Sequence, residues 1–476
     1  MTLEALTAPE GATFERRSPV TGEVATVATA ATVAQALAAA DAAAAAFPAW
    51  SRTGPARRRE LLNRAADLLQ ERADAFVRCM VEETGTSAGW AQFNVRGGIG
   101  ALREAAALTT HVSGDTIPSD LPGCMAMTFR VPVGVVFGMA PWNAPLLLGL
   151  RAIVAPLACG NTVVLKASEH CPGSHWMIGR LFADAGFAQG VVNVVTHDAP
   201  EAAAIVEALI EHAAVRRVNF TGSTRVGRII GAIAGRALKP CLLELGGKSP
   251  LVVLRDADIE LAVNAAAFGA FMNQGQICMS TERVVVEEDI ADRFAEALAA
   301  KAKALGAATA GKPAVLFESL ISCPAADQVE AMVRDAQERG ARVLVPLQRE
   351  GARMGPVVLD HVRPGMRVYD DESFGPIAAI VRVADLEEAV RVANDTEYGL
   401  AGAVFGRDIS RTLEVAQRLE CGVCHVNGPT VKSEPQLPFG GVKSSGYGRF
   451  GGRAAIQEFT ELRSVTIQVA PQAYPF

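Results

Sequence analysis

Apolar runs rich in β-branched residues alternate with amphipathic runs through residues 134–244. The strand-like runs cover 134–139, 162–166, 191–195, 216–220 and 241–244. The helical runs between them lie near 145–158, 173–185, 200–212 and 224–237. Strands that alternate with helices at this spacing form a parallel sheet with helices on both faces. This stretch therefore predicts a doubly wound α/β domain of the kind that binds nucleotides.

A second alternation of the same kind begins after residue 278. Its strand-like runs cover 283–287, 343–346, 378–382, 402–405 and 423–426. The helical runs between them lie near 290–304, 326–340, 386–394 and 409–419. We expect a second α/β domain here. Nearer the N-terminus, an Ala-rich run at 32–46 and helical spacing over 55–82 predict further helices.

Residues 462–469 form a solitary strand-like run near the end of the chain. A strand without a neighbour in the sequence must pair elsewhere, often across a subunit boundary. Together with residues 114–133 it predicts a small β arm for oligomerisation, in a homodimer or homotetramer. The expected organisation is a nucleotide-binding domain (1–113 and 134–244), a catalytic domain (245–440) and a bridging arm (114–133 and 459–476).

Composition and charge narrow the range of partners. The 476 residues are 50% apolar and 20% charged, with a net charge of -6 and a pI near 5.8. This balance is typical of a globular protein with two or three domains. No basic stripe predicts a nucleic-acid face. The first residues, Met-Thr-Leu-Glu-Ala, lack the pattern of a secretion signal, so we expect a cytoplasmic protein.

An uncharged stretch at 131–150 has the length of a membrane span. Three prolines interrupt it, and the polar pair Trp142–Asn143 stands in its middle. These residues fit a buried strand, a loop and a helix start better than a membrane helix. No membrane partner is expected.

Nine cysteines are spread along the chain. Without a secretion signal they indicate reduced thiols and not a disulfide framework. The segment CGVCH (421–425) has the spelling of a haem-attachment motif, but such attachment requires export. We therefore interpret these cysteines as small buried thiols, and no metal site is predicted.

Cys278 is the residue around which the candidate chemistry is arranged. It ends the Gly-hinged segment NQGQIC (273–278), and Glu244 precedes it in LELGGK (243–248). A thiolate can attack a carbonyl carbon, and a carboxylate can later activate water against the resulting ester. The pair indicates covalent catalysis, whereas a lone thiol would indicate only core filling.

Three further segments place polar side chains after predicted strands. In PWNAP (141–145), the Asn143 amide either donates to an oxyanion or caps the helix that follows. FTGSTRVG (220–227) contains GxxxxG, which differs from the dinucleotide fingerprint GxGxxG. KASE (166–169) ends a strand, where a carboxylate can accept bonds from ribose hydroxyls. Alone, each segment is weak evidence.

In order and spacing, these segments resemble the aldehyde dehydrogenase superfamily, from near residue 15 to the C-terminus. ESFGP (372–376) and PFGGVKSSG (438–446) match the family as well. GMAPWNAPLLLGLR (138–151) and VVLKASE (163–169) look like the branch typified by salicylaldehyde, vanillin and benzaldehyde dehydrogenases. The resemblance implies oxidation of an aromatic aldehyde to the carboxylate, with NAD as the cofactor.

The resemblance also implies a role for each matching position. Cys278 is the nucleophile, Glu244 activates the deacylating water, and Asn143 holds the oxyanion with the backbone N–H of Cys278. Lys166 joins this catalytic set and also binds the adenosine ribose. The expected cofactor contacts are Trp142, Lys166, Glu169, Gly222, Ser223, Gly227, Leu245, Glu372 and Phe374. The expected substrate contacts are Trp90, Ala144, Leu147, Arg151, Ile277, Met279 and Phe439.

Three of these positions carry a physical argument. Glu169 favours two free ribose hydroxyls and repels a 2′-phosphate, so NAD is expected over NADP. Arg151 either stacks on the substrate ring or binds a phenolic oxygen, or else it forms a salt bridge away from the site. Trp90 is either a pocket wall or ordinary core packing.

Other functions remain open at this point. A CoA-acylating semialdehyde dehydrogenase needs no water-activating carboxylate, so Glu244 favours hydrolysis. An aliphatic or betaine-type aldehyde would use the same chemistry. A non-catalytic use of the fold is opposed by the presence of Cys278, Glu244, Asn143 and Glu372 together. We expect the loop 428–437 to form a pocket wall, and the segment 306–320 is shorter than the family usually shows.

Overall fold

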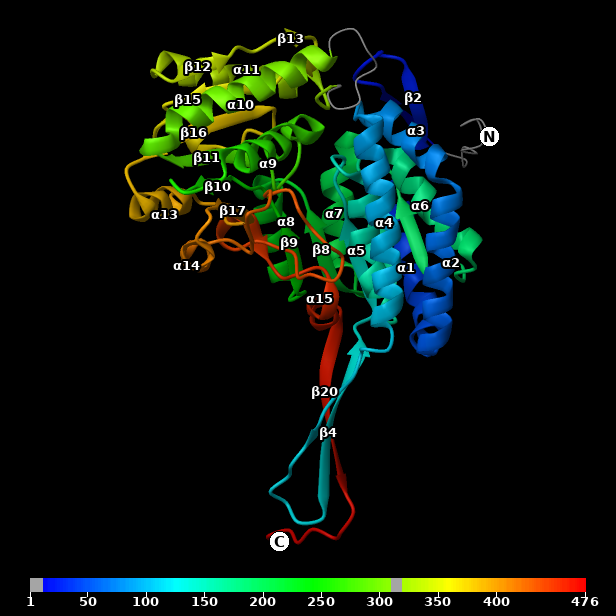
Figure 1. Cartoon of the computed structure of the whole chain (residues 1–476). Helices are drawn as coiled ribbons and strands as arrows, with labels where there is room; N and C mark the ends of the chain where they lie inside the picture. The colour runs from blue at the N-terminus through cyan, green and yellow to red at the C-terminus, as the bar shows by residue number, and fades with distance from the viewer. Residues whose placement is uncertain (1–11, 310–318) are drawn as a thin grey trace.

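A computed structural model describes residues 12–309 and 319–476, which form two α/β units and a narrow projecting arm (Figure 1). The first unit is built on a sheet of order β19-β9-β8-β5-β6-β7. Its parallel strands are β5 (Val135–Met139), β6 (Thr162–Lys166), β7 (Val192–Val195), β8 (Val215–Thr221) and β9 (Cys241–Glu244), with β19 (Gly446–Tyr447) antiparallel at the edge. The doubly wound parallel sheet predicted from the sequence is confirmed.

Helices cover both faces of this sheet, because side chains along a strand alternate between its faces. In β5, Val136 packs into one core while Val135, Phe137 and Met139 pack into another. The first core is covered by α2 (Pro55–Glu71), α3 (Ala73–Thr84), α4 (Ala88–Leu108), α5 (Pro145–Ala158) and α6 (Pro172–Ala185). The second is covered by α1 (Val33–Ser51), α7 (Ala202–Glu211) and α8 (Thr224–Arg236).

The second unit contains a sheet of order β12-β15-β16-β11-β10-β17-β18, in which β12 alone is antiparallel. Its strands are β10 (Ser249–Val253), β11 (Thr281–Glu287), β12 (Arg342–Val345), β15 (Val357–Asp360), β16 (Ile377–Val383), β17 (Ala401–Phe405) and β18 (Val423–Val426). One face packs on α9 (Ile259–Phe271) and α10 (Glu288–Thr309). The other packs on α11 (Cys323–Glu338), α12 (Arg367–Asp370), α13 (Leu386–Asn394) and α14 (Ile409–Arg418).

β10 and β15 were not predicted from the sequence. Each is a short strand beside or containing a proline, Pro250 in β10 and Pro356 just before β15. Proline is typical of loops and strand ends because it donates no hydrogen bond. Both strands are nevertheless buried on their two faces, so burial outweighs the local signal.

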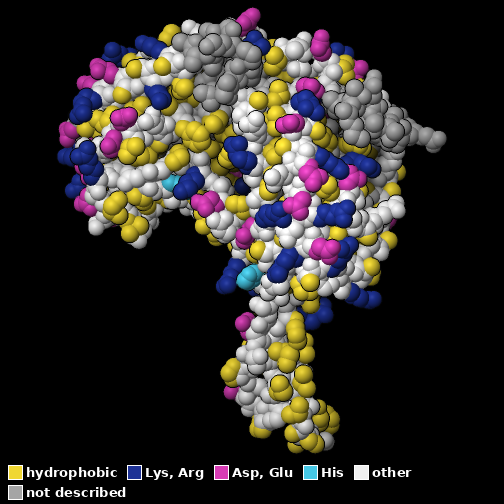
Figure 2. All heavy atoms as spheres, turned by 45° about the vertical axis from the view of Figure 1, so that its right-hand side comes forward, with side chains coloured by type: hydrophobic (Ala, Val, Ile, Leu, Met, Phe, Trp, Pro, Cys, Tyr) yellow, Lys and Arg dark blue, Asp and Glu magenta, His cyan; other side chains and the backbone are white. Residues whose placement is uncertain are grey.

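The arm consists of β20 (Thr460–Gln468), β4 (Cys124–Pro132) and β3 (Thr116–Ile117). β20 pairs antiparallel with β4 along its whole length, from Thr460 opposite Pro132 to Gln468 opposite Cys124. The run predicted at 462–469 therefore pairs within its own chain. Hydrophobic side chains gather over the arm (Figure 2).

Short elements complete the fold. They are β1 (Thr13–Arg17), β2 (Val24–Thr29), β13 (Arg349–Glu350), β14 (Arg353–Met354), η2 (Ala199–Glu201), η3 (Met272–Gly275), η4 (Lys443–Ser445) and α15 (Gly452–Glu458). Most of the segment 306–320 lies outside the described residues. Within residues 12–309 and 319–476, no helix combines the length and apolar character needed to cross a membrane.

Candidate active site

Four of the predicted site residues directly follow or end parallel strands of the first sheet: Asn143 after β5, Glu169 after β6, Ser223 after β8 and Glu244 at the end of β9. The strand order of this sheet reverses between β5 and β8. In open α/β sheets, ligands bind outside the carboxyl ends of the strands at such a point. The topology thus brings residues that are distant in the sequence to one edge.

Cys278 follows a tight left-handed turn between α9 and β11. Asn273, Gln274 and Gly275 have φ angles of 49°, 54° and 70°, a region that residues with a side chain rarely adopt. A Cβ atom at Gly275 would lie 2.1 Å from the carbonyl oxygen of Gly375. Only glycine fits this position. The close packing of the turn against Gly375 therefore holds the backbone that carries the thiol.

Asn143 lies against this turn and does not cap α5. The N-cap of α5 is Ala144, which makes no side-chain capping bond. Asn143 Nδ2 donates to the carbonyl of Gln276 over 3.0 Å, and the Asn143 carbonyl accepts from Trp90 Nε1 over 2.8 Å. The amide is therefore anchored two residues before Cys278. Trp90 lines the neighbouring cavity and also holds this loop in place.

Glu244 is a fully buried carboxylate. Among the described residues, neither of its oxygens has a hydrogen-bond partner at ordinary length and angle. Burial raises the pKa of Glu244, while Arg151, Cys278 and Thr221 act in the opposite direction. Buried polar atoms are nearly always hydrogen-bonded. This carboxylate therefore has free capacity to bind a water molecule or to take a proton.

Burial also raises the pKa of the Cys278 thiol well above its ordinary value, and Glu244 and Glu372 add to the rise. Arg151 lowers the pKa of Cys278. Burial lowers the pKa of the Arg151 guanidinium itself, while Glu244 and Cys278 raise it. The thiol is therefore protonated near pH 7, and its thiolate fraction increases with pH. These three side chains form one coupled unit, called here the Cys278–Glu244–Arg151 group.

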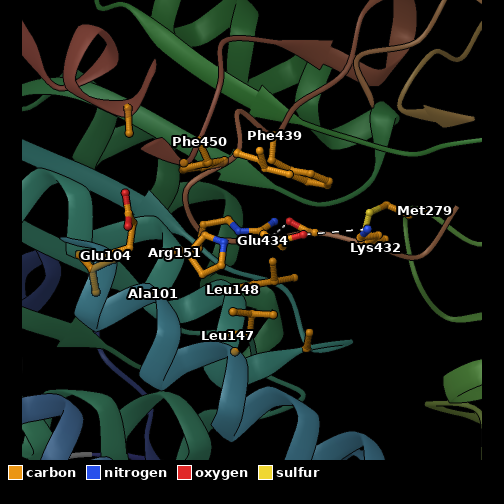
Figure 3. A pocket seen from close by; sticks show the side chains of 18 of the residues that line it. Ala101, Glu104, Leu147, Leu148, Arg151, Met279, Lys432, Glu434, Phe439 and Phe450 are labelled. Carbon is orange, nitrogen blue, oxygen red and sulfur yellow. Dashed lines mark hydrogen bonds and ion pairs between the residues drawn. The ribbon is translucent and has the colours of Figure 1, made fainter. Parts of the chain in front are cut away.

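An apolar cavity of about 160 Å³ has Cys278 in its lining. Figure 3 shows Arg151 between Phe439 and the pair Leu147 and Leu148. All seven positions predicted to contact the substrate line this cavity: Trp90, Ala144, Leu147, Arg151, Ile277, Met279 and Phe439. Most of them belong to a single apolar cluster around the thiol.

Arg151 makes no ion pair within 4 Å in the part of the chain that the structure describes. Its guanidinium carbon lies 4.5 Å from the centre of the Phe439 ring. Its Nη2 donates to Ser433 Oγ in a long hydrogen bond of 3.5 Å. The salt-bridge alternative is therefore wrong for the described residues, and the guanidinium stacks on a ring of the cavity wall.

Some lining residues were missed from the sequence. In α4, the residues Phe93, Gly97, Ala101 and Glu104 follow Trp90 in steps of three or four and line the same cavity. Residues at this spacing lie on one face of a helix. The spacing could therefore have identified them in the sequence as neighbours of Trp90. The loop 428–437, predicted as a wall, contributes residues 431–435 and 437 to the lining.

Lys166 and Glu169 lie at and just beyond the end of β6. Lys166 Nζ donates to the carbonyl of Ala167 over 3.1 Å. Burial lowers the pKa of Lys166, while Glu169 raises it. For Glu169, burial raises the pKa, but Lys166, its own backbone N–H, His170 and His197 together lower it below the ordinary value. Glu169 is therefore ionised at neutral pH.

The segment FTGSTRVG joins β8 to α8. Ser223 is the N-cap of α8, and its Oγ accepts a backbone N–H of the first turn over 3.4 Å. A Cβ atom at Gly227 would lie 2.3 Å from Leu245 Cδ2, and one at Gly222 would lie 2.3 Å from Phe220 Cζ. Both glycines thus make room for neighbouring side chains of the protein, Leu245 and Phe220.

Glu372 and Phe374 reach this region from the second unit. Glu372 Oε1 accepts the backbone N–H of Gly247 over 2.9 Å, and burial raises the pKa of Glu372 to about 8. Phe374 has a φ angle of 45°. Its ring meets the Trp142 ring edge-on, with 5.7 Å between the centroids. Both predicted aromatic residues therefore lie side by side.

A buried ion pair that the sequence analysis missed supports this segment. Lys248 Nζ and Glu282 Oε2 are 2.7 Å apart, and both side chains are buried. Glu282 Oε1 accepts the backbone N–H groups of Ser373 and Phe374, each over 3.1 Å. Lys248 also donates to Ser373 Oγ over 3.1 Å. The pair therefore fixes the backbone that carries Glu372.

Comparison with known proteins decides the family. The family model named aldehyde dehydrogenase family matches residues 6–465. The chain belongs to this family. It is 54% identical to the vanillin dehydrogenase of Pseudomonas fluorescens, over 98% of this chain and 97% of that one. Membership confirms the resemblance carried by the motifs and makes the protein an oxidoreductase.

Two solved structures resemble this aldehyde dehydrogenase closely. The crystal structure of a salicylaldehyde dehydrogenase from Pseudomonas putida G7, complexed with salicylaldehyde, is 47% identical with a TM-score of 0.95, covering 98% of this chain and 97% of that one. The crystal structure of PnpE in complex with nicotinamide adenine dinucleotide is 36% identical with a TM-score of 0.93, covering 98% and 96%.

The electrostatics of this aldehyde dehydrogenase site can be tested by alkylation. We expect Glu244→Gln to speed iodoacetamide labelling of Cys278 at pH 8 roughly three- to tenfold, because it removes a negative charge that raises the thiol pKa. Arg151→Gln should slow labelling by a similar factor. Labelling rates against pH, mapped to Cys278 by mass spectrometry, measure both effects.

Ser433→Ala is the matched control, since it removes a hydrogen-bond partner of Arg151 without changing any charge. It should leave the dependence of the Cys278 labelling rate on pH unchanged. A Glu244→Gln protein that labels no faster than the unaltered protein would contradict the assigned coupling.

Proposed function

We propose that this aldehyde dehydrogenase oxidises aromatic aldehydes to carboxylates with NAD. The observation that carries the proposal is an apolar cavity that has Cys278 in its lining, beside the buried carboxylate of Glu244. The vanillin and salicylaldehyde dehydrogenases among its relatives support an aromatic substrate. The NAD complex of PnpE supports the cofactor.

The first chemical step is attack of Cys278 on the aldehyde carbon. Because burial raises the pKa of both groups, Glu244 can accept the thiol proton within the Cys278–Glu244–Arg151 group. The Asn143 amide and the backbone N–H of Cys278 donate hydrogen bonds to the oxygen as it gains charge. The product of this step is a thiohemiacetal on Cys278.

The cofactor is expected at the carboxyl edge of the first sheet. Lys166 and Glu169 would bind the hydroxyls of the adenosine ribose, with Ser223 beside the pyrophosphate at the N-terminus of α8. Glu372 would bind the nicotinamide ribose, next to Phe374 and Trp142, while Gly222, Gly227 and Leu245 shape the backbone nearby. Bound NAD supplies the hydride acceptor that the oxidation requires.

Hydrolysis of the thioester completes the reaction. Glu244 is buried near Cys278, and its oxygens lack ordinary hydrogen bonds among the described residues. It can therefore hold a water molecule and remove its proton as the water attacks the acyl carbon. The same argument disfavours a CoA-acylating enzyme, in which CoA would replace this water.

The cavity wall suits a flat ring. Figure 3 shows Phe439 on one side of Arg151 and Leu147 on the other, and Ala144 leaves space beside Asn143. Ile277 and Met279 supply apolar contacts next to the thiol. The Arg151 guanidinium, which already stacks on Phe439, can also bind a phenolic oxygen.

A panel of aldehydes tests the substrate class. Reduction of NAD is followed without CoA, using salicylaldehyde, vanillin, benzaldehyde and hexanal, with Cys278→Ala as the inactive control. We expect the best aromatic aldehyde to exceed hexanal by at least about tenfold in kcat/KM, or roughly 1.4 kcal/mol. Equal turnover of hexanal would contradict the aromatic proposal, and a requirement for CoA would contradict hydrolysis by Glu244.

Glu169 provides a separate test of cofactor choice. Replacing it by Gln removes the charge that repels a 2′-phosphate, so the ratio of kcat/KM for NAD to that for NADP should fall by roughly tenfold. Asp198→Asn, which changes a carboxylate just beyond β7, should leave the ratio in place. An unchanged ratio in Glu169→Gln would show that another group sets the preference.

We also propose that the arm mediates association into a dimer or tetramer. Met125, Phe129, Leu462 and Ile467 are exposed apolar side chains on its paired strands. Phe129→Ser combined with Leu462→Ser should lower the molar mass in sedimentation equilibrium toward that of one chain, 49.9 kDa. A mass of one chain for the unaltered protein would refute the proposal. A cytoplasmic location stays a prediction from the sequence.

A further inference from the structure

His175 connects two loops of the site without lying in either. It is fully buried in the first turn of α6. Its Nδ1 accepts the backbone N–H of Ser168 over 3.0 Å, and its Nε2 lies 3.0 Å from the carbonyl oxygen of Pro145. Ser168 belongs to the segment 166–169, and Pro145 ends the segment 141–145. One imidazole thus spans the two segments that follow β6 and β5.

The two bonds require a neutral imidazole with its proton on Nε2. Nδ1 faces an N–H group, so this nitrogen must be the acceptor, and Nε2 then donates to the carbonyl. Burial lowers the pKa of His175 to about 4, and Lys166 adds to the effect. The ring is therefore neutral near pH 7, with one donor and one acceptor.

The surrounding packing is shaped to accommodate this ring. A Cβ atom at Gly149 would lie 2.5 Å from Ile178 Cδ1 and 3.2 Å from His175 Cδ2, so α5 leaves room for both of these side chains of α6. Cys171, the N-cap of α6, has its Sγ 3.9 Å from the carbonyl oxygen of Pro141 and 3.8 Å from His175 Nδ1. The start of α6 therefore contacts both ends of the segment 141–145.

We propose that His175 is a positioning residue that holds the oxyanion segment 141–145 and the ribose segment 166–169 in a fixed relation. It acts on Asn143 through the Pro145 carbonyl and on Glu169 through the Ser168 N–H. The inference rests on the proposed function for the roles of Asn143 and Glu169. Its consequence is that substrate oxidation and cofactor binding depend on two separate atoms of one side chain.

Two conservative substitutions separate the two bonds. In His175→Asn, the amide oxygen can replace Nδ1 and keep the bond to Ser168, but the side chain is too short to reach Pro145. In His175→Gln, the amide nitrogen can replace Nε2 and keep the bond to Pro145, while the acceptor for Ser168 is lost. His175→Phe removes both bonds and retains a ring.

The measurements are kcat for the best aldehyde and the Kd for NAD by calorimetry, which needs no turnover. One hydrogen bond corresponds to an effect of roughly three- to tenfold. We expect His175→Asn to lower kcat by this factor with the Kd near that of the unaltered enzyme. His175→Gln should weaken NAD binding by this factor with kcat retained at saturating NAD, and His175→Phe should show both losses.

Phe182→Leu is the control, since it perturbs a fully buried residue of the same helix that bonds to neither loop. It should lower Tm and leave kcat and the Kd in place. Equal losses of kcat and NAD affinity in the Asn and Gln variants would overturn the inference. Absence of aldehyde turnover by the unaltered enzyme would instead overturn the proposed function, while the calorimetric comparison would still report on the ribose segment.

Nitrogen-15 spectra of the histidines provide a second test that needs no turnover. Seven histidines are present in the chain, and the signals that disappear in His175→Phe identify the ring of His175. A neutral Nε2–H tautomer at pH 6 supports the inference. An Nδ1–H tautomer or a charged ring at that pH would overturn it.

Discussion

Burial of Glu244 beside the partly buried Cys278 and Arg151 is the constraint on which the rest of the site depends. Taking an ionisable thiol and a carboxylate out of water disfavours the charged form of each, and two negative charges so close together disfavour it further. Arg151 is the cation that opposes both effects. In the proposed reaction, the proton would therefore pass between sulfur and oxygen within the Cys278–Glu244–Arg151 group.

Buried polar side chains hold the loops around this group in place. Loops lack the regular hydrogen bonds of helices and sheets, so their buried backbone groups need other partners. Glu282 supplies acceptors for two N–H groups beside Glu372, and Lys248 neutralises its charge. Trp90 and His175 instead donate hydrogen bonds to carbonyl oxygens of the loop that carries Asn143. Glu282, Trp90 and His175 bond to backbone atoms, so they can fix a geometry without entering the chemistry.

Much of this arrangement is predictable from the sequence, for physical reasons. The period of apolar residues indicates the parallel sheet, and such a sheet brings the residues after its strands to one edge. Cys278 and Glu244 are recognisable because their residue types suit acyl transfer. What periodicity does not reveal is whether a helix face borders a core or a cavity, so Phe93 and Glu104 of α4 were missed.

The ion pair of Lys248 and Glu282 escaped prediction for a different reason. The contribution of this pair to the structure depends on how far both charges are removed from water. It also depends on the backbone N–H groups of a distant segment, which need acceptors. Neither property is visible in the local sequence. The position of β20 is a similar case. Its pattern indicates a strand, but only the tertiary structure shows that β4 of the same chain is its partner. Local patterns thus predict elements and residue types, whereas long-range polar contacts require the assembled fold.

Arg151 joins two properties of the site that would otherwise be independent. It is part of the cavity wall, where it stacks on Phe439, and it is also the cation that lowers the pKa of Cys278. Under the proposed function, an oxygen substituent on a bound ring would accept a hydrogen bond from the same guanidinium that stabilises the thiolate. A substrate bound more firmly at Arg151 would then meet a less ionised thiol. Recognition of ring substituents and activation of the thiol would therefore compete for one positive charge.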